Sequence, residues 1–351
     1  MINNLLKIVV LTIFLSVSKR LNAEKIFHVH IQIPPGINGK SFFINYDDGV
    51  KSHLVVDSFK NNILEFHGNF TSKYATLTIK YNVNDSLSFD DRYFIGTKPV
   101  ELDFLIEDST VDRNPFHNCN VKNAIEIDKT NMSINRSIYC RNEINDMNVF
   151  WKTNGSFIGR VDSITKIFYH KLDLLNLKNI AFTKHNRSDY FSFWWFRNHV
   201  VPNTLLIYGD DSLQIQKMLI ILNNIFPRKF INTEEAKALR TELTGRLTVK
   251  ENRMAPGFET KDIQGNLIKL KDFNGKFVLL DFWATWCIPC MKQVPFLKEI
   301  RQEYPADKLI MISISADIDS SRFDSVIKKN AMNWIHIYGG GNLPKRYGIT
   351  A

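Results

Sequence analysis

The chain has 351 residues, of which 44% are hydrophobic and 12% aromatic, with 26 Phe against only 16 Gly. This supply of apolar side chains is enough for two or three packed domains and excludes a chain that is disordered along its length. The formal net charge is +9, but Lys and Arg are interspersed with Asp and Glu. That distribution favours a solvated surface over a basic patch for an acidic partner, and no nucleic-acid-binding motif accompanies it.

The first 23 residues have the layout of a secretory signal peptide. Lys7 precedes an apolar run over 8–17, and Ala23 is a small residue at the expected cleavage point. A run of about ten residues is short for the ~30 Å hydrocarbon layer, so cleavage is expected, and an uncleaved, tethering anchor is the alternative. The signal predicts an exported protein of the periplasm or outer cell envelope, where thiols tend to be oxidised.

Residues 24–107 are expected to form a small antiparallel β domain with the architecture of a sandwich. Phe27 and Ile31 belong to a strict alternation of apolar and polar residues, as in a strand with one buried face. Further strands are expected over 41–46, 53–59, 74–81 and 100–106. His28 and His30 then lie together on the wet face of the first strand, where a surface pair is favoured over a metal site.

Residues 108–249 are expected to be mainly helical or irregular. Helices are predicted over 188–199, 212–226 and 233–247. Trp194 and Trp195 stand in an aromatic cluster that could form a ligand platform, but core packing is the favoured interpretation.

Cys119 and Cys140 lie in this middle region. In an exported chain, a structural disulfide between them is the expected arrangement, and it would stabilise the fold by roughly 3 kcal/mol. The alternative is two unpaired thiols, because the sequence does not give the distance between them.

Residues 250–351 alternate strands and helices, which predicts an α/β thioredoxin-like fold. Residues 277–282 form a nearly continuous apolar run, typical of a strand that is covered on both faces. Cys287 and Cys290 follow at the expected start of a helix. A C-x-x-C at a strand–helix junction within a βαβ pattern is a strong redox signal. A zinc site would need a second Cys/His pair with ligand spacing, and this stretch has none.

The position of the two cysteines predicts their roles. At a helix start, free backbone N–H groups and the helix dipole stabilise the thiolate of Cys287, which is the attacking species in disulfide exchange. Cys290, about one turn further on, is expected to resolve the mixed disulfide. Trp286 and Pro289 surround the pair, and Pro289 fixes φ where its missing N–H costs little. No cofactor beyond the Cys287–Cys290 disulfide is expected.

Asp281 is an ionisable residue in the middle of an apolar strand. It is expected to be buried beneath the cysteines with a raised pKa, and to take the proton of Cys290 as a general base. The alternative is that it only caps the adjacent loop.

The motifs of this last region resemble those of a known family. Ala-Pro-Gly-Phe at 255–258, Lys-Asp-Phe-Asn-Gly-Lys at 271–276 and Leu-Asp-Phe-Trp-Ala-Thr-Trp-Cys-Ile-Pro-Cys at 280–290 resemble the TlpA/ResA-like redoxins, exported thioredoxin-fold thiol–disulfide oxidoreductases of the bacterial envelope. The resemblance implies Cys287 as nucleophile and Cys290 as resolving thiol, and Asp281 matches the buried acid of thioredoxin. It also implies protein thiol or disulfide substrates and a membrane electron donor.

Two features depart from the family pattern. Gln293 occupies a position where many relatives carry a Glu. The printed chain ends at Ala351, whereas relatives continue into a cis-proline loop, a β-hairpin and a final helix, so an incomplete, C-terminally truncated fold is expected.

The function predicted from the sequence is that of an exported thiol–disulfide oxidoreductase acting on proteins, as a reductase. The alternative from another class is a non-catalytic envelope binding or assembly module with a degenerate or incomplete redoxin domain. A peroxidase is a third possibility, although it would use a differently placed cysteine.

Overall fold

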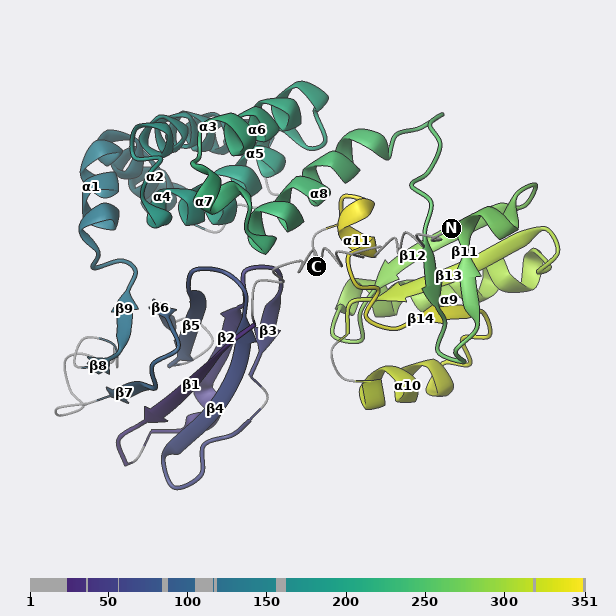
Figure 1. The fold of residues 1–351 in the computed structure, drawn as a ribbon, viewed down its shortest axis with the longest axis horizontal. Helices are drawn as coiled ribbons and strands as arrows, with labels where there is room; N and C mark the ends of the chain where they lie inside the picture. The colour runs from purple at the N-terminus through teal and green to yellow at the C-terminus, as the bar shows by residue number, and fades with distance from the viewer. Residues whose placement is uncertain are drawn as a thin grey trace, which may run out of the picture.

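The computed structural model describes residues 24–349, except 36, 56, 84–87, 105–115, 117–118, 156–161 and 318–319. The predicted signal peptide, residues 1–23, lies outside the described residues. Figure 1 shows a β region, a group of helices above it and a C-terminal α/β region beside them. This is the β, helical and thioredoxin-like order expected from the sequence. None of the described helices is long and apolar enough to cross a membrane.

The β region is a sandwich of two sheets. The first sheet has the order β4 (Ile63–Phe70), β1 (Lys25–Gln32), β7 (Val100–Phe104) and β8 (Cys119–Lys122). The second has the order β3 (Ser52–Leu54), β2 (Phe42–Asp47), β5 (Ala75–Asn82), β6 (Ser88–Ile95) and β9 (Ala124–Glu126). Side chains of the two inner faces, such as Phe27, Leu77 and Leu102, are fully buried between the sheets. The alternation predicted for the first strand is confirmed.

Three features of the sandwich differ from the prediction. The strands β1 and β7 pair in parallel, so the domain is not purely antiparallel. The strands β8 and β9 lie beyond residue 107 and complete the two sheets. Strands β4 and β6 were not predicted; the burial of β4 alternates, but Gly68 interrupts its apolar pattern. A Cβ at Gly68 would lie 2.5 Å from the Phe27 ring and 2.7 Å from the Tyr46 ring, so a glycine makes room for both rings.

The middle region is a group of helices. Its members are α1 (Asn131–Tyr139), α2 (Arg141–Asn154), α3 (Asp162–His185), α4 (Tyr190–Trp195), a π-helical turn over Phe196–Val200, α5 (Val201–Tyr208), α6 (Ser212–Asn224), α7 (Arg228–Ile231) and α8 (Glu234–Thr248). Trp194 and Trp195 are buried in one aromatic core, so the packing interpretation of this cluster is confirmed. The Trp194 indole N–H donates to Thr76 Oγ1 at 2.9 Å, which joins the helices to the sandwich.

The C-terminal region contains a three-stranded parallel sheet of order β12 (Phe277–Trp283), β13 (Leu309–Ser315) and β14 (Ile335–Ile337). The helices α9 (Ile288–Glu303) and α10 (Ser320–Lys329) connect these strands in turn. A hairpin of β10 (Glu259–Lys261) and β11 (Leu267–Lys269) precedes the sheet, and α11 (Leu343–Arg346) follows it. This β–β–β–α–β–α order is the one expected from the apolar patterns, with β14 and α11 in addition.

The helix α8 and the C-terminal region pack closely against each other. A Cβ at Gly245 would lie 2.5 Å from the carbonyl oxygen of Lys345 and 2.6 Å from the backbone nitrogen of Gly348. The Lys345 ammonium in turn donates to the carbonyl of Val50 in the sandwich. The α11 segment therefore contacts both of the other regions (Figure 1).

Candidate thiol–disulfide active site

The two cysteines lie where β12 passes into α9. Strand β12 ends at Trp283, and Cys287 is the N-cap of α9, with an extended backbone (φ −81°, ψ 95°). The Cys290 backbone N–H donates to the sulfur of Cys287 at 3.2 Å. The two sulfurs form a disulfide, with their Cα atoms 5.2 Å apart. The sequence therefore placed this pair correctly at a strand–helix junction.

An N-cap position supplies what a thiolate requires. The first turn of a helix has backbone N–H groups without intrahelical partners, and the helix dipole is positive at this end. When the disulfide is reduced, the Cys287 thiolate would accept a hydrogen bond from the Cys290 backbone N–H, because the Cys287 sulfur already lies in contact with that group. Pro289 lies within the first two helical positions, where its missing N–H removes no helical bond.

The surroundings of the two cysteines differ. Trp286 is 59% exposed and Ile288 is 70% exposed, so apolar side chains flank Cys287 on the surface. Cys290 instead packs against a buried cluster that contains Trp283 and Phe323. Cys290 therefore lies on the side of the pair that faces the core.

A buried carboxylate fixes the loop that leads to Cys287. Asp317 follows β13, and its two oxygens accept the Thr285 backbone N–H, each at 3.0 Å. The Thr285 hydroxyl donates to Oδ1 and the Ser315 hydroxyl to Oδ2, both at 2.6 Å. Asp317, Thr285 and Ser315 are all buried. Sequence reasoning missed this network, although the carboxyl ends of adjacent parallel strands meet at one edge of a sheet.

Asp281 lies in β12, on the same side of the sheet as Cys290. Trp283 is two residues further along the strand, so its side chain shares the face of Asp281, and Trp283 packs in the cluster with Cys290. Asp281 Oδ2 accepts the Ser313 hydroxyl at 2.9 Å. Burial raises the pKa of the Asp281 carboxyl, and the hydrogen bond from Ser313 opposes that rise. The predicted proton transfer to Asp281 stays a prediction.

The predicted disulfide between Cys119 and Cys140 is wrong, because both thiols are free. Cys119 begins β8 in the first sheet, and its thiol donates to the carbonyl of Asn120 at 3.8 Å. Cys140 is fully buried between α1 and α2, where its thiol donates to Asn179 Oδ1 at 3.7 Å. One thiol thus belongs to the sandwich and the other to the helical core, and each has its own partner.

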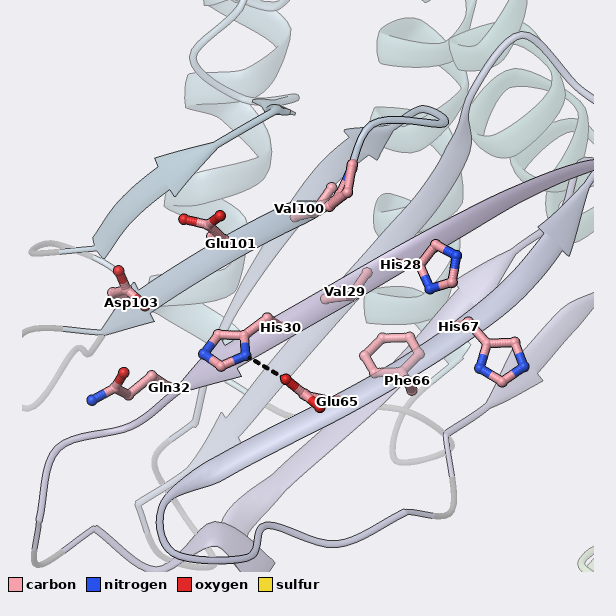
Figure 2. Close-up of a pocket in the computed structure, with 11 residues that line it drawn as sticks. His28, Val29, His30, Gln32, Glu65, Phe66, His67, Val100, Glu101 and Asp103 are labelled. Carbon is pink, nitrogen blue, oxygen red and sulfur yellow. Dashed lines mark hydrogen bonds and ion pairs between the residues drawn. The ribbon is translucent and has the colours of Figure 1, made fainter.

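The histidines of β1 line a separate, open pocket of about 670 Å³ on the outer face of the first sheet. Figure 2 shows His28 beside His67 of β4, with ring centroids 5.9 Å apart, and His30 bonded to Glu65 at 3.0 Å. The outward position predicted for His28 and His30 is confirmed. Within the described part of the chain, no three His, Cys, Asp or Glu side chains are grouped to hold a metal ion.

Comparison with known families finds a match for the C-terminal region. Residues 252–350 match the model of the AhpC/TSA family. The resemblance to TlpA/ResA-like redoxins is thereby confirmed for this part of the chain.

Individual relatives are named for thiol–disulfide chemistry. Thiol-disulfide oxidoreductase ResA of Bacillus thuringiensis subsp. konkukian is 36% identical over 106 residues, which cover 28% of this chain and 61% of that protein. Thioredoxin-like protein YneN of Bacillus subtilis is 42% identical over 67 residues, covering 19% and 39%. The crystal structure of the thioredoxin domain of a Bacteroides vulgatus thiol-disulfide oxidoreductase is 24% identical, with a TM-score of 0.28, and covers 29% of this chain and 76% of that one. The chain thus spans less than two thirds of the length of these curated relatives.

Proposed function

We propose that this protein is an exported thiol–disulfide oxidoreductase that reduces disulfides in protein substrates through Cys287 and Cys290. The observation that carries the proposal is the Cys287 sulfur at the N-cap of α9, in hydrogen-bond contact with the Cys290 N–H at 3.2 Å. The names of the ResA and YneN relatives support this chemistry, and the predicted signal at 1–23 supports export.

The exchange proceeds in two steps. In the reduced protein, the Cys287 thiolate attacks one sulfur of a substrate disulfide; the substrate S–S bond breaks, a mixed disulfide forms, and the first substrate sulfur leaves as a thiolate. Cys290 then loses its proton to Asp281 and attacks the Cys287 sulfur. The second substrate sulfur leaves, and the Cys287–Cys290 disulfide forms, so that two electrons have passed to the substrate.

Each cycle leaves the pair oxidised, so a dithiol donor must reduce it again. For an exported protein, we propose that a membrane partner supplies these electrons. The redox group is the disulfide itself, and the exposed side chains of Trp286 and Ile288 supply an apolar surface for the substrate polypeptide.

An insulin-reduction assay with dithiothreitol as electron source tests the proposal. We expect Cys287→Ser to abolish the acceleration over dithiothreitol alone. Cys290→Ser should accumulate a mixed disulfide on a non-reducing gel, because the resolving thiol is missing. Cys119→Ser is the matched control and should retain full activity, since Cys119 lies in the sandwich. Equal activity of the wild type and Cys287→Ser would contradict the proposal and favour a non-catalytic module.

Export is tested separately. A tagged chain with its first 23 residues should appear outside the cytoplasm, and a chain that begins at Glu24 should stay inside. Identical distribution of the two chains would contradict the export proposal.

A further inference from the structure

Three residues form a polar row across the C-terminal sheet. Asp281 of β12 is the register partner of Ser313 of β13, and Ser313 is the register partner of His336 of β14. Register partners in a parallel sheet direct their side chains to the same face. Ser313 and His336 are each only 1% exposed, and Asp281 is half-buried, so the row starts in the core beside the cluster against which Cys290 packs.

The direction of the hydrogen bonds in this row follows from the chemistry of the donors. The Trp334 indole N–H, which can only donate, donates to the Ser313 oxygen at 2.8 Å. Ser313 therefore accepts from Trp334 and has one proton of its own, which it donates to Asp281 Oδ2 at 2.9 Å. Trp334 thus orients the hydroxyl of Ser313, and Ser313 occupies one of the two oxygens of Asp281.

The remaining groups on this face leave the Asp281 carboxyl without a charged neighbour. His336 Nε2 donates to the carbonyl of Met332 at 3.0 Å, and burial lowers the pKa of His336, so its ring is neutral at pH 7. Among the described residues, no Lys or Arg forms an ion pair with Asp281. The titratable groups nearest to it in the fold are His336, in the same row on β14, and Cys290, which packs against the cluster of Trp283 on the same face.

We infer that Ser313 and Trp334 are positioning residues for Asp281: their hydrogen bonds hold Oδ2 and leave Oδ1 as the oxygen that receives the proton of Cys290. This inference rests on the proposed function, in which Asp281 is the general base. A carboxyl held in this way presents the same oxygen in each cycle and does not have to reorient when Cys290 attacks. The bond from Ser313 also favours the ionised carboxylate, which is the form that can accept a proton.

The step that involves Cys290 can be measured directly in the full chain. The reduced protein is mixed with 5,5′-dithiobis(2-nitrobenzoate), and Cys287 attacks the reagent, releasing one thionitrobenzoate and keeping the other as a mixed disulfide. Attack by Cys290 then releases the second thionitrobenzoate and closes the Cys287–Cys290 disulfide. The rate of this second release, recorded from pH 4 to pH 9, gives the pH profile of the Cys290 step.

The inference predicts shifts in that profile. Ser313→Ala removes a bond to the ionised carboxylate, so the pKa of Asp281 rises and the acidic limb moves to higher pH by about one unit, which is about a tenfold lower rate at acidic pH. Trp334→Phe should move the limb in the same direction by less. Ser313→Thr, which keeps the hydroxyl, should follow the wild type. Trp195→Phe is the matched control, because this buried indole N–H has no hydrogen-bond partner among the described residues, and it should shift nothing.

A double variant separates positioning from a purely structural role. In an Asp281→Asn background, Ser313→Ala should cause no further change in the profile. A Ser313→Ala profile that coincides with the wild type, or a shift that persists without Asp281, overturns the inference. If the wild type itself shows no second release, the proposed function fails, and the inference fails with it. If Ser313→Ala does not fold, Trp334→Phe and Ser313→Thr still decide the question.

Discussion

The hydroxyl of Thr285 donates to Oδ1 of Asp317 at 2.6 Å, and the same carboxylate accepts the Thr285 backbone N–H at 3.0 Å. Thr285 stands two residues before Cys287, and Asp317 stands just beyond the end of β13. This contact therefore fixes the loop that delivers Cys287 to the start of α9 against the neighbouring strand of the sheet. It gives Cys287 a defined position without touching its sulfur.

Thr285→Val tests this anchor. The substitution keeps the shape of the side chain but removes the hydroxyl donor, and the buried Asp317 carboxylate loses one of its partners. We expect the C-terminal domain to lose about 1–3 kcal/mol of stability, measured by hydrogen exchange of peptides from 277–290 at increasing urea. Thr241→Val, at a half-buried position of α8, is the matched control and should change stability by less than about 0.5 kcal/mol. Equal losses in the two variants would show that Asp317 does not anchor the loop.

The contrast between Cys287 and Asp317 shows what the sequence could predict. Cys287, Cys290 and Asp281 belong to one short stretch in which an apolar strand is followed by a C-x-x-C, so local patterns located them. Asp317 meets Thr285 across 32 positions of sequence, and its role depends on strand register, which no local pattern encodes. The same limit explains why strands β8 and β9 were missed, because they are short and gain stability only by pairing with β7 and β6.

Glu235 gives the fold a pH dependence. It is 1% exposed at the start of α8, and Tyr190 donates to its Oε2 at 3.1 Å. Burial raises the pKa of Glu235 to about 7, although the charge of Arg197 and the Tyr190 bond oppose the rise. Between its ordinary pKa near 4.5 and about 7, the unfolded chain releases this proton while the folded chain keeps it. Stability therefore falls as pH rises through this window and levels off above it.

Glu235→Gln removes this titration. We expect the wild type to lose roughly 1–3 kcal/mol more than the variant between pH 5 and pH 7.5, measured as the change in urea midpoint of the helical region. Glu234→Gln, at the neighbouring position where the side chain is 43% exposed, should keep the slope of the wild type. Parallel pH dependences for the wild type and Glu235→Gln would contradict a raised pKa at this site.

Gly245→Ala tests the contact between α8 and the segment of α11 and Gly348. Alanine favours a helix by about 1 kcal/mol over glycine, so α8 itself should gain stability. However, the added Cβ would lie 2.5 Å from the Lys345 carbonyl oxygen, closer than atoms can approach, so the C-terminal region must move away. We expect faster proteolysis of the connection at 249–256 than in the wild type. Thr244→Ala, at the adjacent exposed position, is the control and should be cleaved at the wild-type rate. If Gly245→Ala is also cleaved at the wild-type rate, Gly245 and Lys345 are not in close contact.

The reactivity of the four cysteines tests the assignment of two free thiols. Burial and the nearby carboxylates of Glu126 and Asp91 raise the pKa of Cys119 to about 12, and burial raises the pKa of Cys140. Both thiols are therefore protonated near pH 7.5, where only a thiolate reacts quickly. After native alkylation of the reduced protein, mass spectrometry should find Cys287 modified first, with Cys119 and Cys140 modified only after unfolding. Detection of a peptide pair linked through Cys119 and Cys140 in the unreduced protein would contradict the assignment of two free thiols. Rapid alkylation of Cys140 in the native protein would contradict its burial.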